Sequence, residues 1–121
     1  MAKKRILVVD DEVNQGLLYE QELTDDGYDV DVVNSGQGAL LMVKEKAYDL
    51  VVLDIGMPHM DGLETLGKML SMDNRLPVIL NTAYPSYKDN FMSWAADAYV
   101  VKSSDLTELK EKIRESLEKR K

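Results

Sequence analysis

The chain has 121 residues, of which 45% are hydrophobic and 31% charged, which is typical of one globular domain with a core of its own. Its net charge of −7 argues against nucleic acid or anionic membranes as partners of this domain, because both are held largely by Lys and Arg. The lack of cysteine excludes disulfides and zinc–thiolate sites, and the single histidine excludes a multi-histidine metal site. The apolar run at residues 6–9 is too short for a signal peptide or a membrane span, so we expect a cytoplasmic protein.

Apolar runs and helical patterns alternate along the whole chain. Residues 6–9 and 50–53 are continuous apolar runs of the kind found in parallel strands covered on both faces. Residues 28–33 alternate between Val and Asp, which is typical of an edge strand. The expected strands are 5–9, 28–33, 49–53, 77–81 and 97–101, and the expected helices run to about 26, from 35 through 43, over 62–71, over 86–95 and from 105 onward.

This alternation predicts an α/β fold of one domain over residues 1–121. Five strands, each followed by a helix, favour a flavodoxin-like, doubly wound, five-stranded parallel sheet of order 2-1-3-4-5 with five helices. Ser35 can cap the second helix, and residues 105–108, Asp-Leu-Thr-Glu, have the pattern of a capping box. In the first helix we expect three residues to face inward, namely Leu18, Tyr19 and Leu23.

Charged and hydroxyl residues stand where the predicted strands end. Asp10 and Asp11 follow the first strand, and Asp54 follows the third. Because the first and third strands are neighbours in this order, their carboxylates should share one pocket at the carboxyl edge of the sheet. Carboxylates packed this closely raise each other's pKa, and a hard divalent cation resolves the repulsion. A site of few carboxylates that keeps several waters suits Mg²⁺.

The same edge of the sheet carries groups suited to phosphoryl transfer. Asp54 is the candidate nucleophile, because a carboxylate can attack phosphorus and become an aspartyl phosphate. Lys102 follows the fifth strand and would contact a phosphoryl oxygen, and Thr82 after the fourth strand would donate a hydrogen bond. The metal would neutralise further phosphoryl oxygens.

Four short motifs together resemble those of one family. They are Val-Val-Asp-Asp-Glu at 8–12, Leu-Asp-Ile-Gly-Met-Pro-His-Met-Asp-Gly at 53–62, Pro-Val-Ile-Leu-Asn-Thr-Ala at 77–83 and Ala-Tyr-Val-Val-Lys at 98–102. In this order and spacing they are similar to the receiver domain of response regulators in two-component signalling, and the resemblance covers essentially the whole chain.

The resemblance implies a metal site and a phosphoacceptor. Asp54 would accept the phosphoryl group, and the donor would be a histidine kinase or a phosphotransfer protein. Asp11 would bind Mg²⁺ directly and Asp10 mostly through water, and Asp54 would also be among the metal ligands. Gly56 would offer its backbone carbonyl to the metal.

The resemblance also implies a switch. Thr82 would move toward the phosphoryl group that Lys102 contacts, and Tyr99 would turn inward in response. The readout would be the surface of the expected helix 86–95, the strand 97–101 and the last helix, which could bind an output domain or a second copy. We expect such a switch to catalyse only its own phosphoryl transfer and autodephosphorylation.

Two features depart from the family pattern. The family usually has proline after the lysine, commonly in a cis bond, and this chain has Ser103. A cis bond without proline costs about 2.5–4 kcal/mol, so we expect either a trans bond with a shifted loop or a strained cis bond, and either could displace Lys102. The segment 84–95 is also about two residues shorter than is common in the family and contains Pro85, which predicts a short or irregular helix there.

The proposed site residues and the proposed function both have alternative interpretations. Residues 10–12 could merely stabilise the first helix through its dipole, Thr82 could be a helix N-cap and Tyr99 a plain core aromatic. A strand-end aspartate with Mg²⁺ also serves hydrolases, but that chemistry needs a second acid two residues on, where this chain has Gly56. A flavodoxin-type cofactor is disfavoured because residues 10–12 would repel its phosphate. The chain could be a stand-alone receiver or part of a longer regulator.

Overall fold

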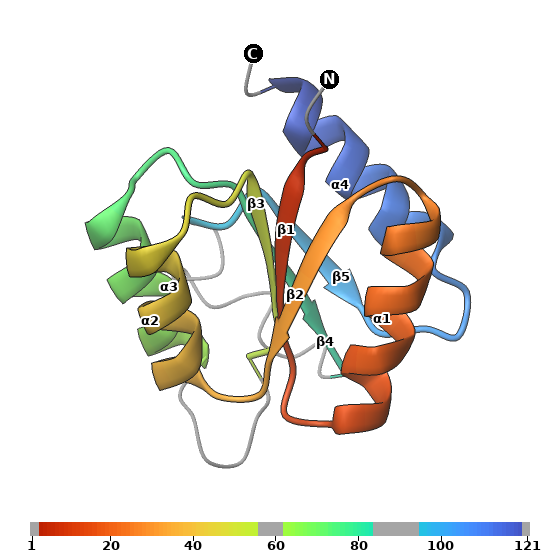
Figure 1. The fold of residues 1–121 in the computed structure, drawn as a ribbon, viewed down its shortest axis with the longest axis horizontal. Coiled ribbons are helices and arrows are strands. Elements are labelled where there is room, and N and C mark those ends of the chain that lie inside the picture. Colours follow the sequence, from red (N-terminus) through yellow and green to blue (C-terminus); the bar gives the residue numbers. More distant parts are fainter. Residues whose placement is uncertain (1–2, 56–61, 84–94, 120–121) are drawn as a thin grey trace.

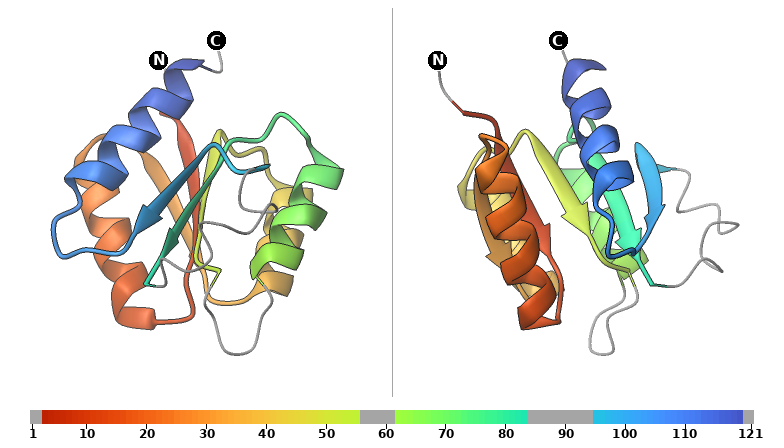
Figure 2. Two further views of the ribbon diagram at one scale, coloured as in Figure 1. Left: turned by 180° about the vertical axis from the view of Figure 1, so that it is seen from behind. Right: turned by 90° about the vertical axis from the view of Figure 1, so that its right-hand side faces the viewer.

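A central sheet with helices on both faces forms the molecule (Figure 1), and the computed structural model describes residues 3–55, 62–83 and 95–119. Figure 2 shows α1 and α4 on one side of the sheet and α2 and α3 on the other. In chain order the elements are β1 (Arg5–Val9), α1 (Val13–Asp25), β2 (Asp29–Val33), α2 (Gly36–Glu45), β3 (Leu50–Leu53), α3 (Gly62–Met72), β4 (Val78–Thr82), β5 (Ala98–Val101) and α4 (Thr107–Lys119).

All five strands are parallel, and their order is β2-β1-β3-β4-β5. This order and the edge position of β2 confirm the sequence prediction. All the strand arrows in Figure 1 point toward the same end of the sheet, so the residues after β1, β3, β4 and β5 gather there. The expected helix 86–95 and Gly56 lie outside the described residues.

Two hydrophobic cores flank the sheet, because alternate residues of each strand point to opposite faces. On the α2 and α3 side the core contains Leu53, Leu66 and Met69, all fully buried. On the α1 and α4 side it contains Tyr19, Leu23 and Ile113, among others. The continuous apolar runs of β1 and β3 arise because both of their faces are covered.

Two local predictions need correction. Leu18 on α1 is 42% exposed, whereas Tyr19 and Leu23 are buried as expected, because the inward stripe of this helix runs through residues 16, 19 and 23. Asp105 does not form the predicted capping box, since its carboxylate accepts hydrogen bonds from the backbone N–H and the hydroxyl of Thr107 at 3.0 and 2.6 Å. Ser35 caps α2 as predicted and accepts a hydrogen bond from the Gly38 N–H at 3.0 Å.

Gly62 brings the start of α3 against the chain that follows β3. A Cβ at this position would lie 2.2 Å from the Cα of Ile55, a distance at which backbone and side chain cannot coexist. Glycine is therefore required for the close approach. Ile55 immediately follows Asp54, so this contact fixes the backbone next to the predicted site. No helix within the described residues has the length and apolar character needed to cross a bilayer.

The edge strand β2 carries Asp31, whose carboxylate is held by two residues that follow α2. The hydroxyl of Tyr48 donates a hydrogen bond of 2.6 Å to Asp31, and the Lys46 ammonium lies 3.4 Å from the same carboxylate. The Tyr48 hydrogen bond, with help from Lys46, holds the pKa of Asp31 below its ordinary value of 3.8. An ionised side chain on an edge strand also discourages pairing with another chain.

We predict that Tyr48→Phe lowers the free energy of unfolding by about 1 kcal/mol at pH 7, the net value of one hydrogen bond. The value is modest because the Asp31 side chain is 37% exposed. Since the folded pKa of Asp31 is depressed, this contribution is complete above about pH 5 and is lost as the pH falls through the folded pKa. Urea unfolding at a series of pH values measures it, and a deficit that stays constant down to pH 3 would contradict the assignment.

Candidate functional site

The predicted site residues continue the sheet beyond its strands. The backbone N–H of Asp10 donates to Val33 O at 3.1 Å, that of Asp54 donates to Val9 O at 3.0 Å, and that of Lys102 donates to Thr82 O at 2.7 Å. At each of these residues the backbone is therefore still hydrogen-bonded to the neighbouring strand just after its own strand has ended. The three side chains start from fixed positions at the carboxyl edge of the sheet.

The Lys102 ammonium bridges two carboxylates. Its Nζ lies 2.8 Å from Asp10 Oδ2 and 2.9 Å from Asp54 Oδ2. The side chains of Lys102, Asp10 and Asp54 are 14%, 2% and 8% exposed, so this is an ion pair at the floor of the site rather than on the open surface. The second Asp10 oxygen, Oδ1, accepts a hydrogen bond of 2.9 Å from the Glu12 N–H, which fixes the orientation of the carboxylate.

Three carboxylates converge in the way that the sequence predicts. One ligand oxygen from each of Asp10, Asp11 and Asp54 lies within 4.8 Å of the other two. Asp11 is half-buried, while the other two are buried. A cluster of carboxylate oxygens that still reaches solvent fits Mg²⁺, which takes one or two carboxylates and keeps several waters.

The charges of this cluster do not cancel. Burial raises the pKa of Asp10 above its ordinary value even though Lys102 and the Glu12 N–H act in the opposite direction. Burial alone would lower the pKa of Lys102, but its hydrogen bonds to Asp10 and Asp54 outweigh burial and raise it. One ammonium therefore faces three carboxylates, and the surplus of negative charge favours a divalent cation.

Ser103 leaves Lys102 in place. Every peptide bond among the described residues is trans, and this includes the bond between Lys102 and Ser103. Of the expected alternatives, the trans bond is the one observed, and the Lys102 ammonium still reaches both carboxylates. The displacement that the sequence departure suggested does not occur.

Thr82 and Tyr99 lie on neighbouring strands. Thr82 is the last residue of β4 and is fully buried. Tyr99 on β5 pairs in register with Leu80 and packs, half-buried, against the core on the α2 and α3 side. The switch roles of these two residues stay predictions, because burial is equally expected of plain core residues.

Two buried polar residues lie close to the site although the sequence assigns neither of them a role in it. Asn81 precedes Thr82 and is 3% exposed, and Tyr19 of α1 is 1% exposed and interacts with the Asn81 side chain. Tyr19 matched the helical spacing of a core residue, and Asn81 lay within a family-like motif. The one available signal is that the polar Asn81 directly follows the apolar run 78–80.

Comparison with known proteins gives one consistent answer. A family model described as response regulator receiver domain matches residues 6–114. The transcriptional regulatory protein PcoR of Escherichia coli is 33% identical over 113 residues, which are 92% of this chain and 50% of PcoR. The response regulator ArlR of Staphylococcus epidermidis is 37% identical over 111 residues, with 90% of this chain and 50% of ArlR covered. The chain thus spans about half the length of these relatives.

A solved structure of similar length shares the fold. The response regulator TrrA of Thermotoga maritima, crystallised in complex with Mg²⁺-BeF, is 47% identical and superposes with a TM-score of 0.90 over 93% of this chain and 98% of TrrA. A second crystal structure holds TrrA in complex with the histidine kinase ThkA and gives a TM-score of 0.88 over 94% of this chain and 98% of TrrA, again at 47% identity.

We predict that Lys102→Met tightens Mg²⁺ binding, because the ammonium occupies the carboxylate oxygens that a cation needs. Loss of a competing interaction of ~1.4 kcal/mol corresponds to about a tenfold lower dissociation constant. The metal-free variant should unfold at lower denaturant, since two buried carboxylates lose their counter-charge. Isothermal titration with Mg²⁺ measures the first effect and urea unfolding the second.

Lys102→Arg is the matched control, because it keeps the positive charge and should bind Mg²⁺ much like the wild type. Weaker or unchanged Mg²⁺ binding in Lys102→Met would show that the lysine and the metal do not compete.

Proposed function

The chain belongs to the response regulator receiver domain family, and we propose that it is a phosphorylation-dependent switch that accepts a phosphoryl group on Asp54. The observation that carries the proposal is the pair of contacts made by Lys102, whose ammonium lies 2.9 Å from Asp54 and 2.8 Å from Asp10. These contacts support the proposal, because a cation, the candidate nucleophile and a further carboxylate lie together at one point of the sheet edge.

The reaction would be an in-line displacement at phosphorus. One Asp54 carboxylate oxygen forms the new O–P bond, the P–N bond of a donor phosphohistidine breaks, and the leaving imidazole nitrogen keeps the electron pair. The Lys102 ammonium then neutralises a phosphoryl oxygen instead of the Asp54 carboxylate. The rigid backbone of β3 and its contact with β1 hold Asp54 in place, which supplies the positioning that such transfers need.

Mg²⁺ would supply further charge neutralisation on the phosphoryl oxygens when it is bound. Its ligands on this chain would be Asp10, Asp11 and Asp54, with the Gly56 carbonyl, outside the described residues, as the fourth expected donor. The convergence of the three carboxylates supports this assignment, and so does the Mg²⁺-BeF complex of TrrA.

The conformational output would pass through Thr82 and Tyr99. Thr82 ends β4 beside the site, and Tyr99 lies one strand further out. A phosphoryl group on Asp54 would draw the Thr82 hydroxyl toward it, and Tyr99 would follow into the space released. The readout surface would then be β5, α4 and the segment 86–95, where an output domain or a second copy would bind.

The phosphodonor would be a histidine kinase or a phosphotransfer protein, as the kinase complex of TrrA supports. Its histidine must reach Asp54, and α1 starts beside that residue. Several large apolar side chains of α1 remain exposed there, which is typical of a docking surface: Val13 is 64%, Leu17 55% and Leu18 42% exposed. We assign the donor to this surface.

The relatives are longer than this chain, so the output belongs to the proposal as well. PcoR of Escherichia coli and ZraR of Salmonella typhimurium are both named transcriptional regulatory proteins. The chain spans 50% of the length of PcoR and 26% of the length of ZraR. We propose that residues 1–121 form one receiver domain, that it acts in the cytoplasm without binding nucleic acid or membrane itself, and that it has no turnover reaction beyond its own phosphorylation and dephosphorylation.

Incubation with Mg²⁺ and acetyl phosphate tests the phosphoacceptor. We expect intact mass spectrometry to show one added phosphoryl group on the wild type, dependent on Mg²⁺ and absent from Asp54→Asn. Asp49→Asn, an aspartate before rather than after β3, is the control and should be modified normally. Continued modification of Asp54→Asn would move the phosphoacceptor elsewhere, and continuous release of phosphate from a small ester would favour the hydrolase alternative.

The docking surface is tested with Leu18→Asp. A charge at this position should slow phosphorylation by a histidine kinase that modifies the wild type by at least about tenfold, the effect expected for one interface residue worth ~1.4 kcal/mol. Labelling by acetyl phosphate should change little, since a small donor needs no docking. Leu41→Asp is the matched control, because it alters a leucine of α2 that is 58% exposed. An equal loss of kinase-dependent phosphorylation rate in both variants would contradict the assignment of α1 as the docking helix.

A further inference from the structure

A row of polar side chains crosses three strands at the end of the sheet. Because the ends of β1 and β3 are paired and Leu53 pairs with Leu80, the residues that follow, Asp10, Asp54 and Asn81, stand side by side. The residues two places earlier on these strands all belong to the core on the α1 and α4 side: Val8, Val52 and Ile79. Since side chains alternate along a strand, the three polar residues face that same side.

Lys102 has to cross β4 to reach its partners. It follows β5, which is paired with β4, while Asp54 and Asp10 follow the next two strands in the order. Neighbouring strands lie about 4.8 Å apart, so the methylene stem of Lys102 runs over the end of β4 before its Nζ reaches Asp54. The buried β4 side chain on that face of the strand end is Asn81, at 3% exposure.

Tyr19 holds Asn81 from the side of α1. Its ring is buried in the core on that side, and its hydroxyl interacts with the Asn81 side chain. Because Asn81 stands beside Asp54 in the register of β3 and β4, this hydroxyl lies close to the site. Burial raises the pKa of Tyr19, although its interaction with Asn81 acts in the opposite direction, so the hydroxyl stays protonated.

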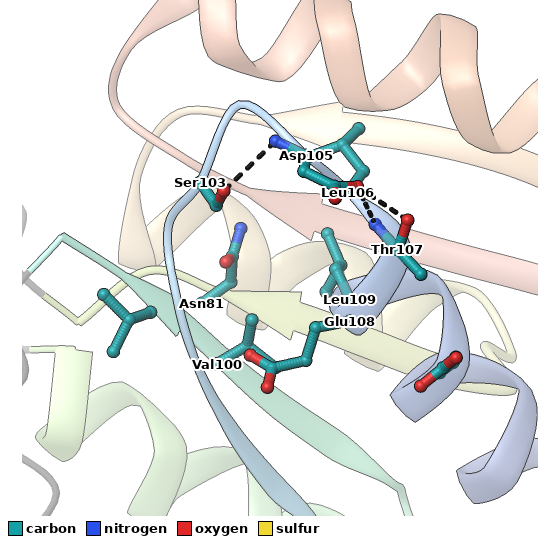
Figure 3. Close-up of a pocket in the computed structure, with 10 residues that line it drawn as sticks. Asn81, Val100, Ser103, Asp105, Leu106, Thr107, Glu108 and Leu109 are labelled. Carbon is teal, nitrogen blue, oxygen red and sulfur yellow. Dashed lines mark hydrogen bonds between the residues drawn. The ribbon is translucent and has the colours of Figure 1, made fainter.

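The loop after Lys102 borders open space on the same side. A cavity of about 400 Å³ lies between Asn81, Ser103, Asp105 and α4. Figure 3 shows the Asn81 side chain rising from β4 toward the loop that carries Ser103 and Asp105. The loop that follows Lys102 therefore leaves open space beside Asn81.

We propose that Asn81, held by Tyr19, is a positioning residue that keeps the Lys102 ammonium between Asp10 and Asp54. The interaction with Tyr19 holds the amide in one orientation and so fixes the surface over which the lysine stem runs. Because the amide carries no charge, it does not attract the ammonium away from Asp54. The consequence for phosphorylation rests on the proposed function, whereas the consequence for Mg²⁺ binding does not.

Asn81→Leu keeps a side chain of similar size and removes its polar groups. A less restrained Lys102 competes less well for Asp10, so the variant should bind Mg²⁺ more tightly than the wild type but less tightly than Lys102→Met. Phosphorylation by acetyl phosphate should slow by about tenfold or more, because displacement of a catalytic group by an ångström costs this much or more. A general loosening of the fold would instead weaken Mg²⁺ binding as well as slow phosphorylation.

Calorimetry with Mg²⁺ and phosphorylation with acetyl phosphate are measured on the same set of variants. Tyr19→Phe, which removes only the hydroxyl, should shift both quantities in the same directions as Asn81→Leu, by smaller factors, and it tests the proposal if Asn81→Leu does not fold. Ser116→Ala changes a buried polar residue of α4 and should leave both quantities unchanged. In a Lys102→Met background, Asn81→Leu should have no further effect on Mg²⁺ affinity.

Tighter Mg²⁺ binding that disappears in the Lys102→Met background supports the proposal. Unchanged or weaker binding in both Asn81→Leu and Tyr19→Phe overturns it, as does an effect of Asn81→Leu that persists without the lysine. If the wild type is not phosphorylated, the proposed function fails, and the Mg²⁺ measurements still decide the role of Asn81.

Discussion

The ion pair between Lys102 and the two carboxylates of Asp10 and Asp54 depends on one property of parallel sheets, which is that the carboxyl ends of all strands meet at one edge. These residues are distant in sequence, yet hydrogen bonds from their own backbone N–H groups to neighbouring strands fix where each side chain starts. The helices and the two cores cover the sheet on both faces, and the close contact of Gly62 with Ile55 constrains the chain next to Asp54.

The charge at this edge is unfavourable for folding and favourable for binding. Three carboxylates share a small volume with one ammonium, and burial raises the pKa of Asp10. A protein selected for stability alone would not retain this surplus, because buried charges without full compensation are costly. A divalent cation can neutralise this surplus of negative charge. A phosphoryl group on Asp54 can then replace the carboxylate as the partner of Lys102, which is what a phosphorylation-driven switch requires.

Helix α1 serves the site in three ways. It begins directly after the acidic residues, its inward face brings Tyr19 against Asn81, and its outward face leaves Leu17 and Leu18 exposed beside the site. The same helix thus links the candidate metal ligands, the residue that we propose to position Lys102 and the surface that we assign to the phosphodonor. Lys110 of α4 holds the far end of α1 through ion pairs with Glu22 and Asp26, at 3.0 and 3.3 Å.

The sequence by itself determined the order of the elements and the identity of the residues at the strand ends. Apolar runs, their interruptions by Asp10 and Asp54, and the alternation of β2 are local signals, because they follow from which faces of a strand are covered. The receiver-like motifs then identified the family, which the comparisons confirm. The sequence did not exclude a displacement of Lys102 by Ser103, because a backbone change after a strand has consequences only in three dimensions.

Tertiary structure decided what each of these residues faces. A one-residue difference in helical phase leaves Leu18 outside and Tyr19 inside, and hydrophobicity does not distinguish the two. Asn81 lies beside Asp54 only because β3 and β4 are neighbours in a particular register, which no local pattern encodes. The bridge made by Lys102 likewise depends on the distance from β5 across β4, a distance set by packing of the whole sheet and not by any segment of the chain.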